Sequence, residues 1–144
     1  MILSQTIEYG FRAAACLAIS GTDGPLSATA LASRTGIPVG YLSKVMRRLV
    51  VAELVRSQRG HGGGFTLARA PETIQFIDVL DALDFSVEQK RCAFGFGQCD
   101  ASDPCPLHDS WASLRSSFLE WACSHTLADF AGADCSGPRS IRMS

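Results

Sequence analysis

Long apolar segments are missing from this sequence of 144 residues, although 47% of its residues are hydrophobic. No apolar run approaches the roughly 20 residues that a membrane-spanning helix needs, so we expect no membrane partner. The first residues, Met1 to Thr6, turn polar too soon for the apolar region of a secretory signal peptide. We therefore expect a soluble protein of a reducing compartment, the bacterial cytoplasm, where cysteine thiols are normally free or metal-bound.

The sequence also lacks the residue patterns of an enzyme. We find no set of nucleophile, base and acid and no carboxylate pair, and His61 and His125 have no evident partners. Neither the Walker lysine pattern nor the strand, loop and helix order of a dinucleotide-binding fold is present. These absences predict that the protein is not an enzyme.

Net charge is small, at −1, but the charges are unevenly distributed. Residues 34–69 hold seven basic side chains and one acidic one, a net charge of +6, whereas residues 70–144 sum to −6. A local basic block beside an acidic remainder is typical of a surface that binds a polyanion. Exposed Arg and Lys on ordinary solvated helices are the simpler explanation of any single charge.

Helical periodicity dominates the first half of the chain. Ser4 can cap a first helix that ends near Gly21, and Ser27 can cap a short helix that Gly36 ends. Pro38 then opens a third helix, at a position where its missing N–H costs nothing. Two short helices joined by a tight turn predict a helix-turn-helix, whose second helix carries Lys44, Arg47 and Arg48 on its wet side.

Two alternating segments, residues 54–58 and 65–69, flank a turn with four glycines among residues 60–64. This pattern predicts a β-hairpin wing with Arg56 and Arg59 at its edge. An acidic amphipathic helix containing residues 74–83 should follow and pack on the helix-turn-helix.

A long helix is predicted from about Leu107 to Ser124. Its bulky apolar residues Trp111, Leu114, Phe118 and Trp121 recur at three- and four-residue spacing. Such a helix needs a second surface to pack against, so we predict a homodimer built on it. The expected fold is mainly α, a winged helix-turn-helix with a small β-hairpin wing and a long C-terminal dimerisation helix. The expected divisions are residues 1–84 for DNA binding, 85–106 for the cysteine loop, 107–131 for the dimerisation segment and 132–144 for a flexible tail.

Soft metal ligands gather in one region, at Cys92, Cys99, Cys105 and His108. Thiolates favour iron-sulfur clusters, zinc or copper(I), and an imidazole can complete a set of four ligands. Structural zinc sites usually hold cysteines two to four residues apart, whereas six and five residues separate these cysteines. The spacing favours an iron-sulfur cluster, while zinc, a disulfide or unligated thiols stay open. Cys16, Cys123 and Cys135 are expected to be structural or incidental.

The order of these features resembles the Rrf-type winged-helix transcriptional regulators, the bacterial family of IscR, NsrR and RirA. The resemblance covers nearly the whole chain and rests on four motifs: Tyr9-Gly10-Phe11-Arg12-Ala13, Ile37-Pro38-Val39-Gly40-Tyr41-Leu42, Arg59-Gly60-His61-Gly62-Gly63-Gly64-Phe65 and Thr126-Leu127-Ala128-Asp129. It implies a homodimer that binds a double-stranded DNA operator. It also implies a [2Fe-2S] or [4Fe-4S] cluster, held by Cys92, Cys99 and Cys105, that reports redox state, nitric oxide or iron status.

The resemblance offers two fourth ligands. His108 matches the position of the fourth ligand in the IscR-like members, and Glu8 matches a carboxylate that the NsrR-like members donate from the other subunit. The plainer interpretations are a surface histidine and a weak surface pair between Glu8 and Arg12. The candidate DNA-binding residues are Ser27, Pro38, Tyr41, Lys44, Arg47, Arg48, Arg56, Arg59 and His61.

Two other functions compete with this prediction. An iron-sulfur electron carrier would explain the cysteines but leave the basic helix-turn-helix and wing without a role. A DNA-binding or protein-interaction module that is zinc-stabilised or free of a cluster would explain both without a sensing function.

Overall fold

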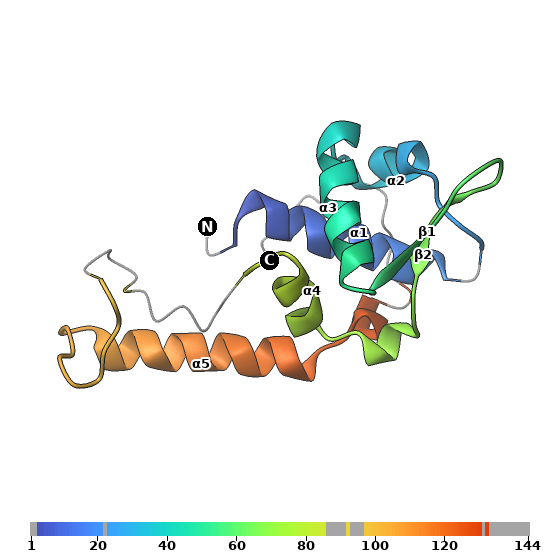
Figure 1. Ribbon diagram of the computed structural model, residues 1–144. Helices are drawn as coiled ribbons and strands as arrows, with labels where there is room; N and C mark the ends of the chain where they lie inside the picture. Colours follow the sequence, from blue (N-terminus) through green and yellow to red (C-terminus); the bar gives the residue numbers. More distant parts are fainter. Residues whose placement is uncertain (1–2, 22, 86–91, 93–96, 131, 133–144) are drawn as a thin grey trace, which may run out of the picture.

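The computed structural model describes residues 3–21, 23–85, 92, 97–130 and 132. Over these residues the protein is mainly helical with a two-stranded antiparallel hairpin, which confirms the predicted winged helix-turn-helix. Figure 1 shows a compact group of helices beside the hairpin and one long helix that runs past them. We call residues 5–21 and 23–85 the head, and we call the long helix together with Cys92 and residues 97–107 the arm.

The helix-turn-helix consists of α2 (Ala28–Thr35) and α3 (Val39–Val51), which lie against α1 (Gln5–Ser20). The side chain of Ser27 caps α2 by accepting a hydrogen bond of 3.1 Å from the backbone N–H of Ala30. Gly36 ends α2 in the left-handed conformation, with φ of 71°, which glycine adopts without a steric cost. Both predicted helix boundaries are therefore confirmed.

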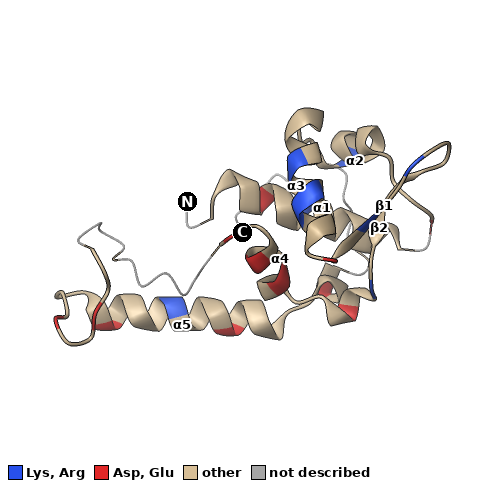
Figure 2. Ribbon diagram, viewed as in Figure 1, with Lys and Arg blue, Asp and Glu red and all other residues tan. Residues whose placement is uncertain are grey.

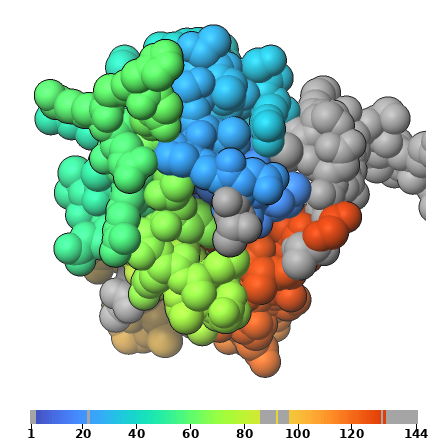
Figure 3. All heavy atoms as spheres, turned by 90° about the vertical axis from the view of Figure 1, so that its right-hand side faces the viewer, coloured from blue at the N-terminus to red at the C-terminus, as the bar shows by residue number. Residues whose placement is uncertain are grey.

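The wing is formed by β1 (Val55–Gln58) and β2 (Gly64–Leu67), in a register that pairs Val55 with Leu67. A bridge between Leu26 and Phe65 also ties β2 to the segment before α2, through backbone hydrogen bonds of 2.8 and 3.0 Å. The green hairpin lies directly beside this blue segment in Figure 3. A Cβ atom at Gly64 would lie 2.3 Å from the carbonyl oxygen of Leu26, so only glycine permits this close approach.

The remaining elements are η1 (Pro71–Thr73), α4 (Phe76–Ala82), α5 (His108–Ser124) and η2 (Leu127–Phe130). The C-terminal end of α5 lies beside α4, and the opposite end projects away from the head (Figure 1). A bridge between Gln75 and Thr126 fixes the chain after α5 to the start of α4. Within the described residues, no helix has the length and the apolar character needed to cross a membrane.

The hydrophobic core lies in the head, between α1, α3 and α4. Its largest fully buried side chains include Leu31, Ile37, Leu42, Met46, Leu49, Ile74 and Leu80. Gly10 lies where α1 packs closely on α4 and the residue that follows it, because a Cβ atom there would lie 2.2 Å from Cδ1 of Leu83. The core therefore sets the position of α3, which carries four of the nine candidate DNA-binding residues.

Candidate functional site

Four basic side chains form an exposed surface over α3 and the wing. Lys44 and Arg47 lie on the solvent side of α3, Arg56 lies on β1 and Arg59 on the turn that follows. No ion pair involves these four among the residues that the structure describes. Lys and Arg occur mainly on α2, α3 and the hairpin in Figure 2, whereas Asp and Glu occur mainly on α4, α5 and their connections. We call these four residues the basic face.

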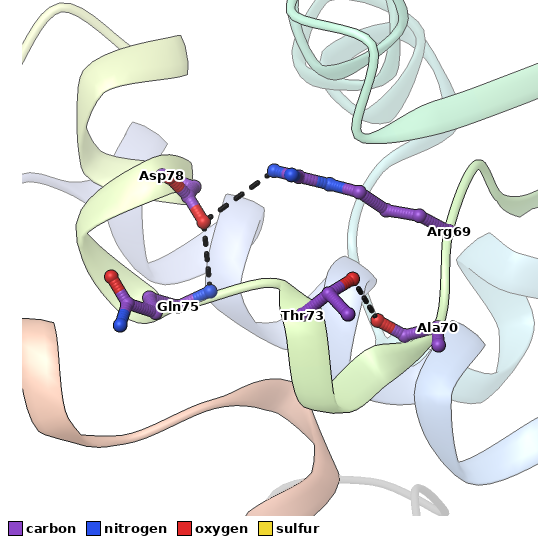
Figure 4. A network of polar contacts seen from close by, with 5 residues as sticks. All are labelled: Arg69, Ala70, Thr73, Gln75 and Asp78. Atoms are coloured by element: carbon purple, nitrogen blue, oxygen red, sulfur yellow. Dashed lines mark hydrogen bonds and ion pairs between the residues drawn. The ribbon is translucent and has the colours of Figure 1, made fainter.

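Two other basic residues of the segment 34–69 form ion pairs with carboxylates of the head. Arg48 forms an ion pair with Asp84, two residues beyond the end of α4. Arg69 lies 3.5 Å from Asp78, whose carboxylate also accepts a hydrogen bond of 2.8 Å from the backbone N–H of Gln75 (Figure 4). These pairs join α3 and the end of the wing to α4. Arg48, a candidate DNA-binding residue, is therefore also a structural residue.

Tyr41 is another candidate that has partners inside the head. Its hydroxyl lies 2.9 Å from Oγ1 of Thr6, and its ring packs edge-on against Tyr9 at 5.1 Å between centroids. Both partners lie on α1. The side chain thus joins the first turn of α3 to α1, a contact that sequence spacing could not show.

The other three candidates lie at the ends of elements on the surface. Ser27 and Pro38 are exposed and occupy the N-cap positions of α2 and α3, and His61 is exposed in the wing turn. The bridge between Leu26 and Phe65 brings the start of α2 close to the wing. The structure therefore places these residues on surfaces of the helix-turn-helix and wing.

The predicted metal ligands of the arm line one open pocket. Cys92, Cys99, Cys105 and His108 all contribute to its walls, and its volume is about 430 Å³. All three cysteines are half-buried. Nδ1 of His108 lies 3.2 Å from Sγ of Cys99. Backbone hydrogen bonds from Cys92 to Gly97 and from His108 to Cys105 shape the walls.

The donors surround the pocket without meeting at one point. Within the described part of the chain, no three of the His, Cys, Asp and Glu side chains are grouped closely enough to hold a single metal ion. Three soft thiols and one imidazole are nevertheless the donor types that an iron-sulfur cluster takes. Their arrangement around a shared space fits a group of several atoms better than a single ion.

Glu8 is absent from the residues that line this pocket and lies on α1. The predicted surface pair with Arg12 is wrong, because no ion pair joins these two described residues. The guanidinium of Arg12 donates a hydrogen bond of 3.3 Å to the carbonyl of Thr35 and lies 5.5 Å from the centre of the Tyr9 ring. Among the described residues, Glu8 therefore contacts neither Arg12 as an ion pair nor the cysteine pocket.

Cys16 and Cys123 are not among the residues that line the pocket. Cys16 is buried in the core of the head and Cys123 is exposed on α5. Cys135 lies outside the described residues.

The apolar side of α5 is divided between the head and solvent. Trp121 stacks on Phe76 at 5.0 Å between ring centroids, and Phe118 meets Phe85 edge-on at 5.9 Å. Leu107 and Leu114 remain about half exposed, at 50% and 51%. Two of the four residues predicted for a dimer interface thus also pack against their own head.

Together, the helix-turn-helix and the basic wing place the protein in the winged-helix class, with a separate pocket lined by three cysteines and a histidine. The Rrf2 family model, described as an iron-dependent transcriptional regulator, matches residues 3–133. The chain belongs to the Rrf2 family.

Curated relatives agree with this assignment. The chain is 34% identical over 129 residues to the HTH-type transcriptional regulator IscR of Sodalis glossinidius, which covers 90% of this chain and 78% of the relative. It is 32% identical, with the same coverage, to the IscR of Klebsiella pneumoniae. These relatives are transcriptional regulators, which confirms that the chain is not an enzyme.

Solved structures show the same fold. The global cysteine regulator CymR of B. subtilis superposes with a TM-score of 0.76 at 27% identity, over 90% of this chain and 95% of that one. IscR of T. potens superposes with a TM-score of 0.70 at 30% identity, over 88% and 83% of the two chains.

Proposed function

We propose that this transcriptional regulator binds its operator as a homodimer and that an iron-sulfur cluster in the cysteine pocket controls its affinity for DNA. The observation that carries the proposal is the pocket itself, because three thiols and an imidazole from a short segment share one space at the start of α5. The similarity to regulators named IscR supports it.

Cys92, Cys99 and Cys105 would hold the cluster as thiolates, and His108 would be its fourth ligand. His108 is favoured because its ring already lies in the pocket, within 3.2 Å of Cys99, and needs no second subunit. Glu8 of the partner subunit is the alternative. When bound, the cluster would supply a centre whose state responds to oxygen, nitric oxide or iron supply, since a non-thiolate ligand binds its iron less firmly.

The chain's own contacts offer a route from the pocket to α3. The first residue of α5 is His108, and the other end of this helix packs on α4 through Trp121 and Phe76. The end of α4 is joined to α3 by the ion pair between Asp84 and Arg48. A change in how the pocket holds α5 would therefore reach the helix that binds DNA through packed elements.

If Glu8 is a ligand, a second route would connect the cluster to α3. It would run through the contact of Tyr41 with Thr6 and Tyr9. Glu8 lies on α1 between those two residues. Ligation by Glu8 of the partner subunit would therefore act on the same turn of α1 that holds the start of α3.

On the DNA, α3 would enter the major groove and the wing would contact the adjacent backbone or the minor groove. Lys44, Arg47, Arg56 and Arg59 would neutralise phosphates or contact base edges. Two such heads related by a two-fold axis favour a roughly palindromic operator, with half-sites about one or more helical turns apart.

Ligand substitutions test this proposal in protein purified without oxygen. Cys92→Ser, Cys99→Ser and Cys105→Ser should each abolish the iron content and the visible absorption. Cys123→Ser is the matched control and should leave both unchanged, because Cys123 lies outside the pocket. Wild-type iron content in all three pocket variants would contradict the ligand assignment.

The fourth ligand is identified by comparing His108→Ala with Glu8→Gln. The change at the true ligand should leave a cluster with an altered resonance Raman spectrum and faster loss in air. The other change should leave the spectrum as in the wild type. If both variants keep the wild-type spectrum and rate of loss, neither residue is the fourth ligand.

A second candidate function is a thiol-responsive regulator without a metal centre. The similarity to the cysteine regulator CymR and the contact between Cys99 and His108 favour it. Colourless protein without iron, with DNA binding that depends on the cysteines, would support this second function.

A further inference from the structure

The first turns of α3 carry few side chains that could form hydrogen bonds to a base. In a helix-turn-helix, the N-terminal residues of the second helix contact base edges. Among the residues from Val39 to Ser43, Leu42 is fully buried and Gly40 has no side chain. The hydroxyl of Tyr41 lies 2.9 Å from Thr6.

The hydroxyl group of Ser43 is also engaged within its own helix. Its hydroxyl donates a hydrogen bond of 3.0 Å to the carbonyl oxygen of Val39, one turn earlier in the same helix. Its donor proton is therefore used within the helix.

Val39 is the side chain that remains, and it points to solvent. It is 48% exposed. Val39, Ser43 and Arg47 are spaced four residues apart, so they lie along one side of α3, and all three are exposed. Val39 thus lies on the same exposed side of α3 as Arg47, which belongs to the basic face.

We infer that Val39 contacts the 5-methyl group of a thymine in each half-site of the operator and is a specificity-determining residue. The inference rests on the proposed position of α3 in the major groove. The thymine methyl is the apolar group that the major groove presents, and small apolar side chains recognise it by contact. Gly40 assists, because a Cβ atom there would meet nothing within 4 Å and its absence lets the helix approach the DNA closely.

Deoxyuridine tests the inference because it differs from thymidine only in the missing methyl group. Operators are first selected from a pool of random duplexes with the purified full-length protein. Each thymine is then replaced by deoxyuridine, in both half-sites together, and affinity is measured. One position should weaken wild-type binding by about fourfold per half-site, the worth of one buried methyl group.

Protein variants complete a double-mutant cycle. Val39→Ala should bind the thymine operator more weakly and should be indifferent to deoxyuridine at that position. Val51→Ala is the matched control, since Val51 is an exposed valine at the other end of the same helix, 77% exposed. It should keep the full sensitivity to deoxyuridine.

Three outcomes would overturn the inference. The first is a wild-type protein for which no deoxyuridine position matters. The second is a Val39→Ala variant that keeps the wild-type sensitivity, which would assign the methyl contact to another residue such as the adjacent Pro38. If either occurs while Arg47→Ala still weakens operator binding, α3 remains the DNA-binding helix and only the role of Val39 falls. The third is the absence of any sequence preference in the selection, which removes the position of α3 in the groove as well.

Discussion

The head and the arm differ in how much of their apolar surface the chain buries by itself. In α3, four of 13 residues are buried, namely Leu42, Val45, Met46 and Leu49. In α5, which has 17 residues, only Ala122 is buried. The head therefore has a hydrophobic core of its own. The arm leaves apolar side chains exposed, and we propose that a second copy of the chain covers them.

This difference matches the division of functions that we propose for them. A DNA-binding head must hold its helices rigidly, because base contacts depend on their position. If the arm reports a signal, as proposed, its structure must change at a small energetic cost. Segments with few buried apolar contacts are the ones that change at such a cost.

The largest expected effect concerns the exposed side of the arm. Leu114→Asp would place a carboxylate in the proposed dimer interface, twice across the two-fold axis. We expect dimerisation to weaken by about 2–4 kcal/mol, because the charge must lose water without a partner. Sedimentation equilibrium measures this change. Glu120→Asp, a change at another exposed position of α5, is the control and should leave the dimer intact. A Leu114→Asp variant with the wild-type dissociation constant would place the interface elsewhere.

The next effect concerns packing in the head. Gly10→Ala should destabilise the fold by about 1–3 kcal/mol, because the new methyl group would overlap Leu83 in the contact between α1 and α4. Gly40→Ala is the matched change on an open helix surface. It should raise stability by about 0.5–1 kcal/mol, since alanine favours the helix. Urea denaturation followed by circular dichroism measures both. If the two substitutions changed the free energy of unfolding by equal, small amounts, α1 and α4 would not be in close contact at Gly10.

The smallest effect distinguishes two adjacent arginines of α3. Arg47→Ala should reduce the salt dependence of operator binding by about one unit of slope, because it removes one phosphate contact. Arg48→Ala should change the slope less and lower the stability of the head, because Arg48 is paired with Asp84. Operator titrations at several salt concentrations, with urea denaturation of both variants, give the two quantities. The reverse pattern would make Arg48 the DNA-contacting residue.

Local sequence patterns predicted the head well. Ser27 as a cap, Gly36 as a helix end and the glycine-rich wing turn are short-range features, and all three appear where they were expected. The cysteines and His108 could also be grouped from spacing alone, since they lie within 17 residues of each other.

Contacts between distant residues could not be predicted from the sequence. The ion pair of Arg48 with Asp84 joins residues 36 apart, and the contact of Tyr41 with Thr6 joins residues 35 apart. Neither has a local pattern, because each depends on how the helices pack. The first gives a structural role to a basic residue that the sequence assigned to DNA, and the second identifies the packing partners of Tyr41.

Operator affinity with and without the cluster is the most direct test of the central claim. The same preparation is titrated with operator DNA before and after the iron is removed without oxygen, at one salt concentration. We predict that the two affinities differ by about tenfold or more, within the usual range of coupling between two sites. We also predict that Cys99→Ser binds DNA as the iron-free protein does, whether or not iron is supplied. Equal affinities for the iron-loaded and iron-free proteins would contradict control of DNA binding by a cluster in the cysteine pocket.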